Sequence, residues 1–291
     1  MDVLLPRTLE EALEMKANRP EARPIAGGTD VMVDLNLDRD RPEALIEVSS
    51  LPELRDWQRE DGTILLGAGV TYTRIMRELP DHVALTQASR TVGSPQIRNR
   101  ATVGGNLGTG SPAGDALPVL AAHDAEIVLA RAGGSRRTLP WNEFSLGVKK
   151  TALAPDELIL ATRWRVLRGP ASFSKIGTRN AMVIAVANLC LVFDEQGRSV
   201  RVALGSVGPT IIRAREAEAF ASEALWRAGA WDDVWAPFPV TDVESFGELV
   251  AGAARPIDDV RGSAAYRRHA TRVLARRAFS WALLDRREMG A

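Results

Sequence analysis

The chain has 291 residues, which is long enough for two domains, and its 45% hydrophobic and 25% charged residues are the composition of an ordinary globular protein. Lysine plus arginine and aspartate plus glutamate both number 37, and no basic run alternates with aromatic residues, so nucleic acid is not expected as a partner. No apolar stretch reaches the length of a membrane span and the N-terminus lacks a signal pattern, so a cytoplasmic protein is expected.

The first half of the chain mixes short helix and strand signals. Thr8 and Glu11 form a capping box, which predicts a helix that ends before Pro20. Thr71 is expected to cap a second helix, over residues 75–79. Strands are predicted at residues 23–26, 44–48, 63–69 and 157–164, a hairpin at 125–130 and 136–139, and further short helices at 31–37 and 116–123.

Gly169 and Pro170 interrupt this pattern and predict a domain boundary. Strand signals follow, and helical signals come after them, an order that favours an α+β second domain. In the last helix, Val273, Leu274, Trp281 and Leu284 are expected to share the buried face. The predicted elements are strands approaching from Phe173 and at 181–193 and 200–207, then helices at 214–226, 246–254 and 266–285.

Two glycine pairs dominate the sequence, in residues 24–30 (PIAGGTD) and 102–106 (TVGGN). Glycine lacks a Cβ, so the backbone can adopt positive φ and approach a ligand closely. Successive amides in such turns form a nest for anions. The second pair lies in a long polar run, residues 93–115, and such runs usually carry function. We therefore expect both segments to close on one ligand with a diphosphate; a tight surface turn is the alternative for either alone.

The chain has one cysteine, Cys190, so it can form no internal disulfide and cannot supply four thiolates to an iron–sulfur cluster. The three histidines, His82, His123 and His269, lack the spacing of metal ligands. No metal site is expected on this chain.

Together the motifs resemble those of the FAD-binding medium subunit of the molybdenum hydroxylases, the family of xanthine dehydrogenase and carbon monoxide dehydrogenase. Each motif alone would be a weak signal, but here they keep the family's order along the whole chain. The matching segments are residues 26–30 (AGGTD), 97–99 (IRN) and 102–106 (TVGGN), Ser111-Pro112 with Asp115, and 258–263 (DDVRGS) with Tyr266-Arg267.

The resemblance implies an α+β fold with two parts. Residues 1–168 would form a vanillyl-alcohol-oxidase-type (PCMH-type) FAD-binding domain, with subdomains at 1–56 and 57–168. Residues 169–291 would form a small domain like the C-terminal domain of the CO dehydrogenase flavoprotein, an antiparallel sheet with helices. The implied cofactor is FAD bound without a Rossmann fingerprint, and the sequence indeed has no GxGxxG motif.

The resemblance also assigns cofactor contacts. The two glycine segments would hold the diphosphate, and a Cβ at Gly28 would intrude on its path. Asp115 would bind flavin sugar or ribityl hydroxyls, and Lys175 would lie near the isoalloxazine. The full set of expected contacts is Pro24, Ile25, Ala26, Gly27, Gly28, Thr29, Asp30, Val31, Val92, Ile97, Thr102, Val103, Gly104, Gly105, Asn106, Ser111, Asp115, Ile159 and Lys175.

Each assignment has a structural alternative. Thr29 and Thr102 could cap turns, Asp115 could cap the helix at 116–123, and Val92 and Ile159 could be core residues. Lys175 could be a solvated lysine at a strand edge.

The function implied by the resemblance is electron transfer, with no acid–base catalytic residue on this chain. A small subunit with [2Fe–2S] clusters and a large molybdopterin subunit would complete a heterotrimer, assembled as a dimer of heterotrimers. FAD would pass electrons to NAD⁺ or another acceptor. A purine such as xanthine is the favoured substrate of the complex. Carbon monoxide, an N-heterocycle or an aldehyde are alternatives, as is a standalone flavin oxidoreductase or a flavin-free scaffold.

Overall fold

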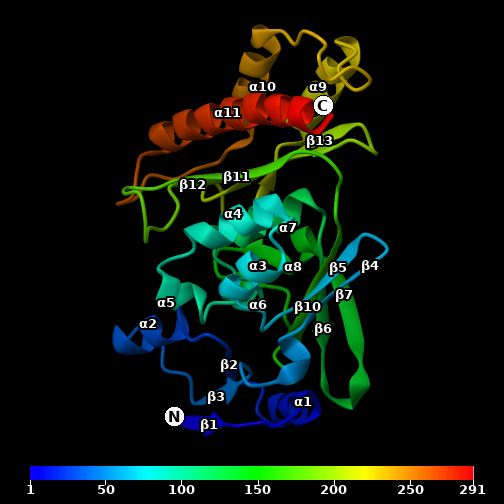
Figure 1. The fold of residues 1–291 in the computed structure, drawn as a ribbon. Helices are drawn as coiled ribbons and strands as arrows, with labels where there is room; N and C mark the ends of the chain where they lie inside the picture. Colours follow the sequence, from blue (N-terminus) through cyan, green and yellow to red (C-terminus); the bar gives the residue numbers. More distant parts are fainter. Residues whose placement is uncertain (291) are drawn as a thin grey trace. The chain divides into compact units, whose positions relative to one another are not determined.

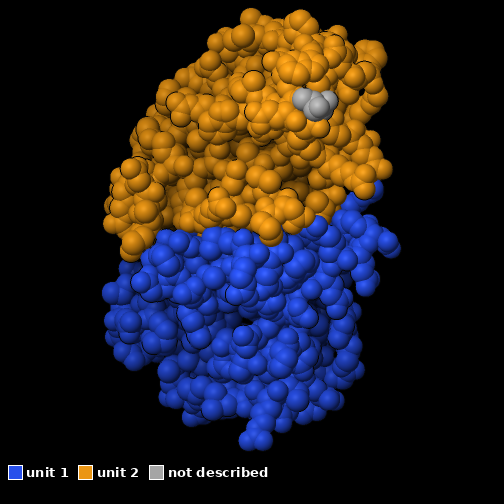
Figure 2. Space-filling view, viewed as in Figure 1, with its two compact units in different colours: residues 1–79, 92–111, 124–165 blue, residues 80–91, 112–123, 166–291 orange. Residues whose placement is uncertain are grey.

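The computed structural model describes residues 1–290, and these divide into two compact units (Figure 2). Unit 1 contains residues 1–79, 92–111 and 124–165, and unit 2 contains residues 80–91, 112–123 and 166–290. The chain therefore leaves unit 1 twice before the predicted boundary near Gly169. The linear domain limits stay a prediction. Within residues 1–290, no helix combines the length and hydropathy needed to span a membrane.

The smaller sheet of unit 1 has three parallel strands in the order β1–β3–β2. They are β1 (Asp2–Leu4), β2 (Arg23–Ile25) and β3 (Ala44–Glu47), and helix α1 (Leu9–Asn18) connects β1 to β2. Thr8 caps α1, since its hydroxyl oxygen accepts the Glu11 N–H at 3.2 Å. This confirms the predicted helix start. Strand β2 ends at Ile25, so the sheet fixes where the first glycine segment begins.

The larger sheet of unit 1 has five antiparallel strands in the order β4–β5–β10–β6–β7 (Figure 1). They are β4 (Trp57–Glu60), β5 (Thr63–Gly67), β6 (Glu126–Ala130), β7 (Arg136–Pro140) and β10 (Leu158–Arg165). Leu158 and Leu160 of β10 share a core with Ile46 of the smaller sheet and with Leu13 of α1. The two sheets are therefore joined through β10.

The remaining elements of unit 1 are short. They are α2 (Val31–Asn36), α3 (Tyr72–Glu78), α5 (Pro95–Arg98), α6 (Val103–Thr109), α8 (Trp141–Phe144), the 3₁₀ turns η1 (Pro52–Leu54) and η2 (Ala132–Gly134), and the hairpin β8 (Ser145–Gly147) with β9 (Lys150–Thr151).

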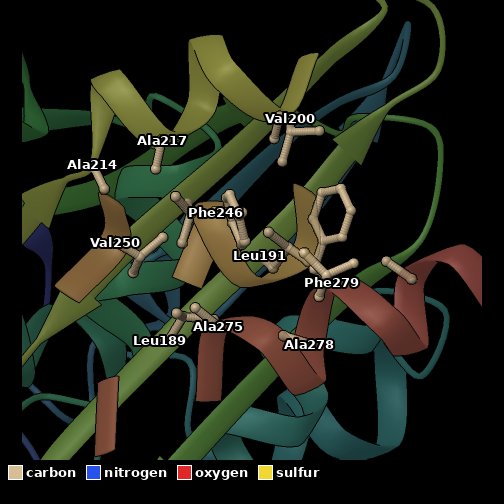
Figure 3. Packing of buried hydrophobic residues seen from close by; sticks show 14 of the residues in the cluster. Leu189, Leu191, Val200, Ala214, Ala217, Phe246, Val250, Ala275, Ala278 and Phe279 are labelled. Carbon is tan, nitrogen blue, oxygen red and sulfur yellow. The ribbon is translucent and has the colours of Figure 1, made fainter. Parts of the chain in front are cut away.

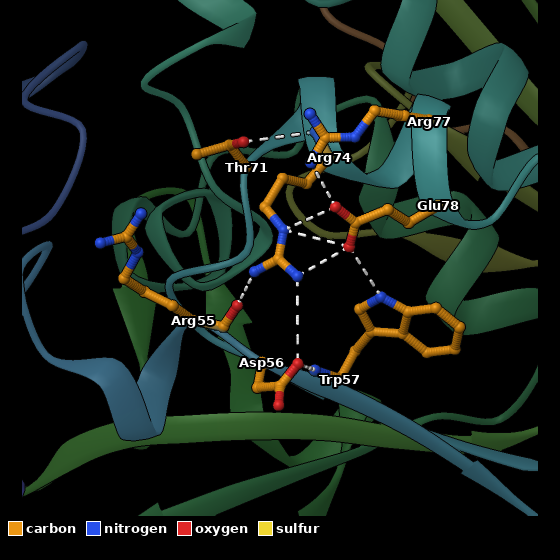
Figure 4. A network of polar contacts seen from close by, with 7 residues as sticks. All are labelled: Arg55, Asp56, Trp57, Thr71, Arg74, Arg77 and Glu78. Atoms are coloured by element: carbon orange, nitrogen blue, oxygen red, sulfur yellow. Dashed lines mark hydrogen bonds and ion pairs between the residues drawn. The ribbon is translucent and has the colours of Figure 1, made fainter.

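Helix α3 is attached to strand β4 by the polar network in Figure 4. Glu78 accepts hydrogen bonds from the Arg74 guanidinium at 2.7 Å and from the Trp57 indole N–H at 3.0 Å. Arg74 also donates to the main-chain carbonyl of Arg55. The Arg74 guanidinium lowers the pKa of Glu78 to about 2, so the carboxylate is ionised at neutral pH.

Unit 2 is built on a four-stranded antiparallel sheet in the order β11–β12–β13–β14. Strand β12 is buried along its whole length, because helices cover both faces of this sheet (Figure 1). The elements are β11 (Ala171–Ile176), β12 (Ala187–Asp194), β13 (Ser199–Gly205), β14 (Ile212–Arg213), α4 (Val83–Thr91), α7 (Ala116–Ala122), α9 (Arg215–Arg227), α10 (Val240–Ala253) and α11 (Ala264–Gly290).

The main core of unit 2 lies between this sheet and helices α9 to α11 (Figure 3). Phe246 and Phe279 pack at its centre, with their rings 4.8 Å apart. Helix α11 buries Ala275, Ala278 and Phe279 there, not the face predicted from Trp281 and Leu284, which are about half exposed. Small alanine side chains on either side of Phe279 let α11 lie close to the sheet. Of the predicted face, Leu274 packs partly against this core.

Several predicted elements differ at their ends. The helix predicted at 75–79 begins at Tyr72, immediately after its Thr71 cap. The strand predicted from residue 181 begins only at Ala187. Residues 103–109, expected as part of a polar loop, form helix α6, because the Thr102 hydroxyl caps its first turn and Leu107 is buried. The α+β fold itself is confirmed.

Candidate functional site

A pocket in unit 1 lies between the two glycine segments. Its walls come from residues 24–31, from residues 101–109 around α6, and from the start of β10. The lining residues are Arg23, Pro24, Ala26, Gly27, Gly28, Thr29, Asp30, Val31, Val48, Leu54, Ala68, Gly69, Ala101, Thr102, Gly104, Gly105, Asn106, Gly108, Thr109, Leu153, Leu158 and Ile159.

The first glycine segment offers a run of free main-chain donors to this pocket. Within residues 1–290, the N–H groups of residues 27–31 have no hydrogen-bond partner. The run begins where Ile25 ends β2 by accepting the Val48 N–H at 2.9 Å. Gly28 has φ +73°, a conformation that glycine adopts without strain. Free, consecutive amides at a pocket wall are suited to an anion such as a diphosphate.

Two glycines allow the pocket walls to meet. A Cβ on Gly27 would lie 2.1 Å from the Arg100 carbonyl oxygen, and a Cβ on Gly104 would lie 2.5 Å from the Ala68 carbonyl oxygen. Gly28 differs, because a Cβ there would face the Met32 side chain at 3.4 Å. The atoms nearest to a Gly28 Cβ are thus all side-chain atoms, and its expected intrusion on the diphosphate path stays a prediction. Gly27 and Gly104 are required by backbone packing, and Gly28 by its φ.

The second glycine segment has few free amides. The Gly104 N–H donates to the Ala68 carbonyl at 3.2 Å, and the Gly105 N–H donates to the Thr102 hydroxyl oxygen at 2.9 Å. The Asn106 N–H donates to the Thr102 carbonyl at 3.1 Å. Thr102 thus has the capping role given as its alternative. On this side of the pocket, the side chains of Thr102 and Asn106 are the polar groups that can reach a ligand.

Four further side-chain contacts shape the pocket. The Thr109 hydroxyl donates to the Asp30 carboxylate at 2.8 Å and links the two glycine segments. The Tyr72 hydroxyl donates to Asn106 Oδ1 at 2.5 Å. Arg23 lies at the pocket, but Asp40 at 2.7 Å and Asp34 at 3.5 Å neutralise its charge.

The buried carboxylate of Glu157 fixes the segment before β10, which forms the third wall of the pocket. Glu157 is 1% exposed and accepts hydrogen bonds from Arg137 at 2.7 Å and from the Ala154 N–H at 2.9 Å. Burial raises the pKa of Glu157, but the hydrogen bonds from Arg137, Ala154 and Arg131 outweigh it and lower that pKa to about 2. The segment that Glu157 fixes carries the pocket residues Leu153 and Leu158.

Most of the expected contacts line this pocket, and some do not. Pro24, Ala26, Gly27, Gly28, Thr29, Asp30, Val31, Thr102, Gly104, Gly105, Asn106 and Ile159 line it. Ile25, Val92, Ile97, Val103, Ser111, Asp115 and Lys175 are not among its lining residues.

Reasoning from the sequence missed Ala68, Gly69, Leu153, Thr109 and the supporting Tyr72. The Gly67–Gly69 turn after a predicted strand was a signal for the first two; the others carry no motif.

Asp115 and Lys175 instead meet inside unit 2. Their ion pair is 2.6 Å long, and both side chains are buried. Thr91 at 3.0 Å and Asn188 at 3.1 Å also donate to Asp115. Asp115 makes no side-chain cap to α7, and Lys175 is not solvated, so both alternatives given for them are wrong. Burial raises the pKa of the Asp115 carboxyl, and Lys175 opposes that change.

Comparison with known proteins shows the family to which this chain belongs. The family model of the FAD binding domain in molybdopterin dehydrogenase matches residues 1–163. That of the CO dehydrogenase flavoprotein C-terminal domain matches residues 172–282. The chain belongs to the FAD-binding subunits of the molybdenum hydroxylases. This flavoprotein subunit is an oxidoreductase component that binds FAD, as expected.

Individual relatives support this family assignment. A xanthine dehydrogenase FAD-binding subunit from Escherichia coli is 30% identical over 290 residues, covering 95% of this chain and 94% of the relative. A nicotinate dehydrogenase FAD-subunit from Eubacterium barkeri is 34% identical over 207 residues, covering 66% and 69% of the two chains. The solved carbon monoxide dehydrogenase from Hydrogenophaga pseudoflava superposes with a TM-score of 0.85 at 26% identity, covering 98% of each chain.

The pocket of the flavoprotein subunit fits the dinucleotide. The free amides of residues 27–31 suit its diphosphate, and the apolar side chains of Leu153, Leu158 and Ile159 suit an aromatic ring system. Within the described part of the chain, no cluster of histidine, cysteine or acidic residues could hold a metal ion.

Proposed function

We propose that this subunit carries FAD as the electron-transfer component of a molybdenum hydroxylase complex. When bound, FAD would accept electrons from [2Fe–2S] clusters on a small partner subunit and deliver them to NAD⁺ or another acceptor. The substrate would be hydroxylated at a molybdopterin cofactor on a large partner subunit. The role of this chain is to bind and orient the flavin.

The observation that carries the proposal is the run of free amides at residues 27–31 on one wall of a pocket closed by the second glycine segment. Backbone donors can hold the diphosphate without a lysine, because several aligned N–H groups supply the partial positive charge. The single cysteine supports the placement of the iron–sulfur clusters on a partner subunit, since such a cluster needs ligands from another chain.

The residues we propose as FAD contacts include the twelve predicted residues that line the pocket. The remaining seven, Asp115 and Lys175 among them, stay predictions from the resemblance. Because Asp115 and Lys175 are paired and buried, either would act on a flavin as part of a joint dipole and not as a lone charge.

A purine is the substrate class that we propose for the complex. The support is the match to xanthine dehydrogenase FAD-binding subunits over nearly the full length of both chains. The nicotinate dehydrogenase relative supports an N-heterocycle as the second candidate.

Purification of the tagged full chain from its own cells tests the proposal. We expect a yellow complex with a small and a large partner chain, iron, molybdenum, and xanthine-dependent reduction of NAD⁺ or a dye. Nicotinate and carbon monoxide provide the comparison substrates. A chain that purifies alone and oxidises a substrate by itself would instead identify a standalone flavin oxidoreductase, and a colourless chain would contradict flavin binding.

A further inference from the structure

We infer that Tyr72 is a positioning residue, which orients the Asn106 side chain so that its NH₂ group faces the bound dinucleotide. The inference rests on the proposal that FAD occupies the pocket between the glycine segments. Tyr72 does not line that pocket, and it acts through Asn106, which does.

The hydrogen bond between the two side chains sets the direction of the amide. Tyr72 is fully buried, and its hydroxyl donates to Asn106 Oδ1 at 2.5 Å. A buried tyrosine hydroxyl needs such a partner. Because the amide oxygen is held by Tyr72, the amide nitrogen, with its two protons, is left for the pocket.

This orientation matters because three main-chain donors of the second glycine segment are already used within the protein. The N–H groups of Gly104, Gly105 and Asn106 all bond within the protein. Asn106 Nδ2 is therefore a donor that this wall can give to an acceptor oxygen of the ligand. If the amide were reversed, its oxygen would face the ligand and repel phosphate or carbonyl oxygens.

Tyr72 itself is held firmly. Its N–H donates to the Ala101 carbonyl at 3.1 Å, immediately before α6, and Thr71 and Thr102 form a β-bridge beside it. The other end of α3 is attached to β4 through Arg74 and Glu78 (Figure 4). The backbone positions of Tyr72 and Asn106 are thus fixed relative to each other, as a positioning role requires.

The test is a double-mutant cycle on the full chain, with the FAD dissociation constant measured by flavin fluorescence on the apoprotein. Asn106→Ala should weaken FAD binding about tenfold or more, and Tyr72→Phe about three- to tenfold. In the Asn106→Ala background, Tyr72→Phe should change the constant by less than about twofold, because the residue through which it acts is gone. An equal effect of Tyr72→Phe in both backgrounds would overturn the inference and indicate a general structural role.

Asn106→Asp provides a second measurement, which does not depend on a Tyr72 variant. Aspartate keeps the acceptor for Tyr72 but removes the donor, so it should bind FAD more weakly than Asn106→Ala. Binding as tight as that of the unchanged chain would overturn the inference. Tyr266→Phe, at the other tyrosine, is the matched control and should leave the constant unchanged. If Asn106→Ala itself had no effect while the unchanged chain bound FAD, the inference would fail and the proposed function would stand. An unchanged chain that bound no FAD would instead contradict the proposed function.

Discussion

At the residue scale, Gly27 is the position where one methyl group should do most harm to FAD binding. Its Cβ would lie 2.1 Å from the Arg100 carbonyl oxygen and 2.9 Å from the Ala101 nitrogen. Both are backbone atoms, so the two glycine segments would have to separate. We expect Gly27→Ala to weaken FAD binding roughly tenfold to hundredfold, the equivalent of an overpacking cost of about 1–3 kcal/mol. The FAD-to-protein ratio and the dissociation constant of the purified chain measure this.

Two glycines serve as controls for that experiment. Gly252, in α10, has open space around a Cβ, so Gly252→Ala should leave FAD binding unchanged. Gly133 lies outside the pocket and has a positive φ of +77°. Gly133→Ala therefore shows the effect of backbone strain alone, without a clash between the two glycine segments. Unchanged FAD binding by Gly27→Ala would contradict the close approach of the two segments.

The sequence predicts many of the residues that line the pocket, but it does not show which tertiary contacts require them there. The glycine pairs predicted Gly27 and Gly104 at the site, yet their reason is contact with Arg100 and Ala68, which are far away in sequence. Likewise, Tyr72 carries no motif, and only the fold places it beside Asn106. Tertiary contacts of this kind leave no local pattern.

At the scale of elements, the segment between β9 and β10 depends on the Glu157 carboxylate. Glu157→Gln replaces an oxygen that faces two arginines with an NH₂ group, so we expect a loss of about 1–3 kcal/mol in the free energy of unfolding. FAD binding should weaken several-fold as well, because Leu153 and Leu158 would be held less firmly. Urea unfolding at pH 7 and FAD titration measure the two effects.

The pH dependence of this loss has a definite sign. The pKa of Glu157 is about 2 in the folded chain, below its ordinary value of 4.5. Its contribution is therefore complete above about pH 5 and disappears as the pH falls toward 2. The stability difference between the unchanged chain and Glu157→Gln should shrink over that range. Glu126→Gln, which breaks an exposed pair with Arg163, is the control and should cost less than about 1 kcal/mol at any pH.

Element types were more predictable than element ends. Capping by Thr8 and Thr71 was visible in the sequence because it depends on local side-chain hydrogen bonds. Helix α6 was missed because glycine-rich sequence has low helix propensity, and its stability comes from the Thr102 cap and from packing against Ala68. The buried face of α11 was misassigned because hydrophobic size was weighed above close packing by alanines.

At the scale of the whole molecule, the opening of each unit can be followed by a separate measurement, FAD release for unit 1 and Cys190 alkylation for unit 2. The pocket residues all belong to unit 1, so release of FAD from the proposed site would report on that unit. Cys190 is fully buried on β12 in unit 2, and burial raises the pKa of its thiol. Alkylation of this thiol therefore requires unit 2 to open, and its rate reports the population of the open form. The order of units along the chain was not visible in the sequence, because residues 80–91 and 112–123 join unit 2 only through tertiary packing.

Breaking the Asp115–Lys175 pair is expected to have a strong effect on the alkylation rate of Cys190. Asp115→Asn leaves the Lys175 ammonium buried without its counter-charge, and breaking a buried pair in this way costs about 3–5 kcal/mol. Cys190 alkylation by a maleimide should then be at least about 100-fold faster, as followed by mass spectrometry. Asp232→Asn, which removes an exposed partner of Arg198, is the control and should change the rate less than about fivefold. If Asp115→Asn alkylated as slowly as the unchanged chain, the ion pair would not stabilise unit 2, and a ligand would be needed to explain two buried charges at this place.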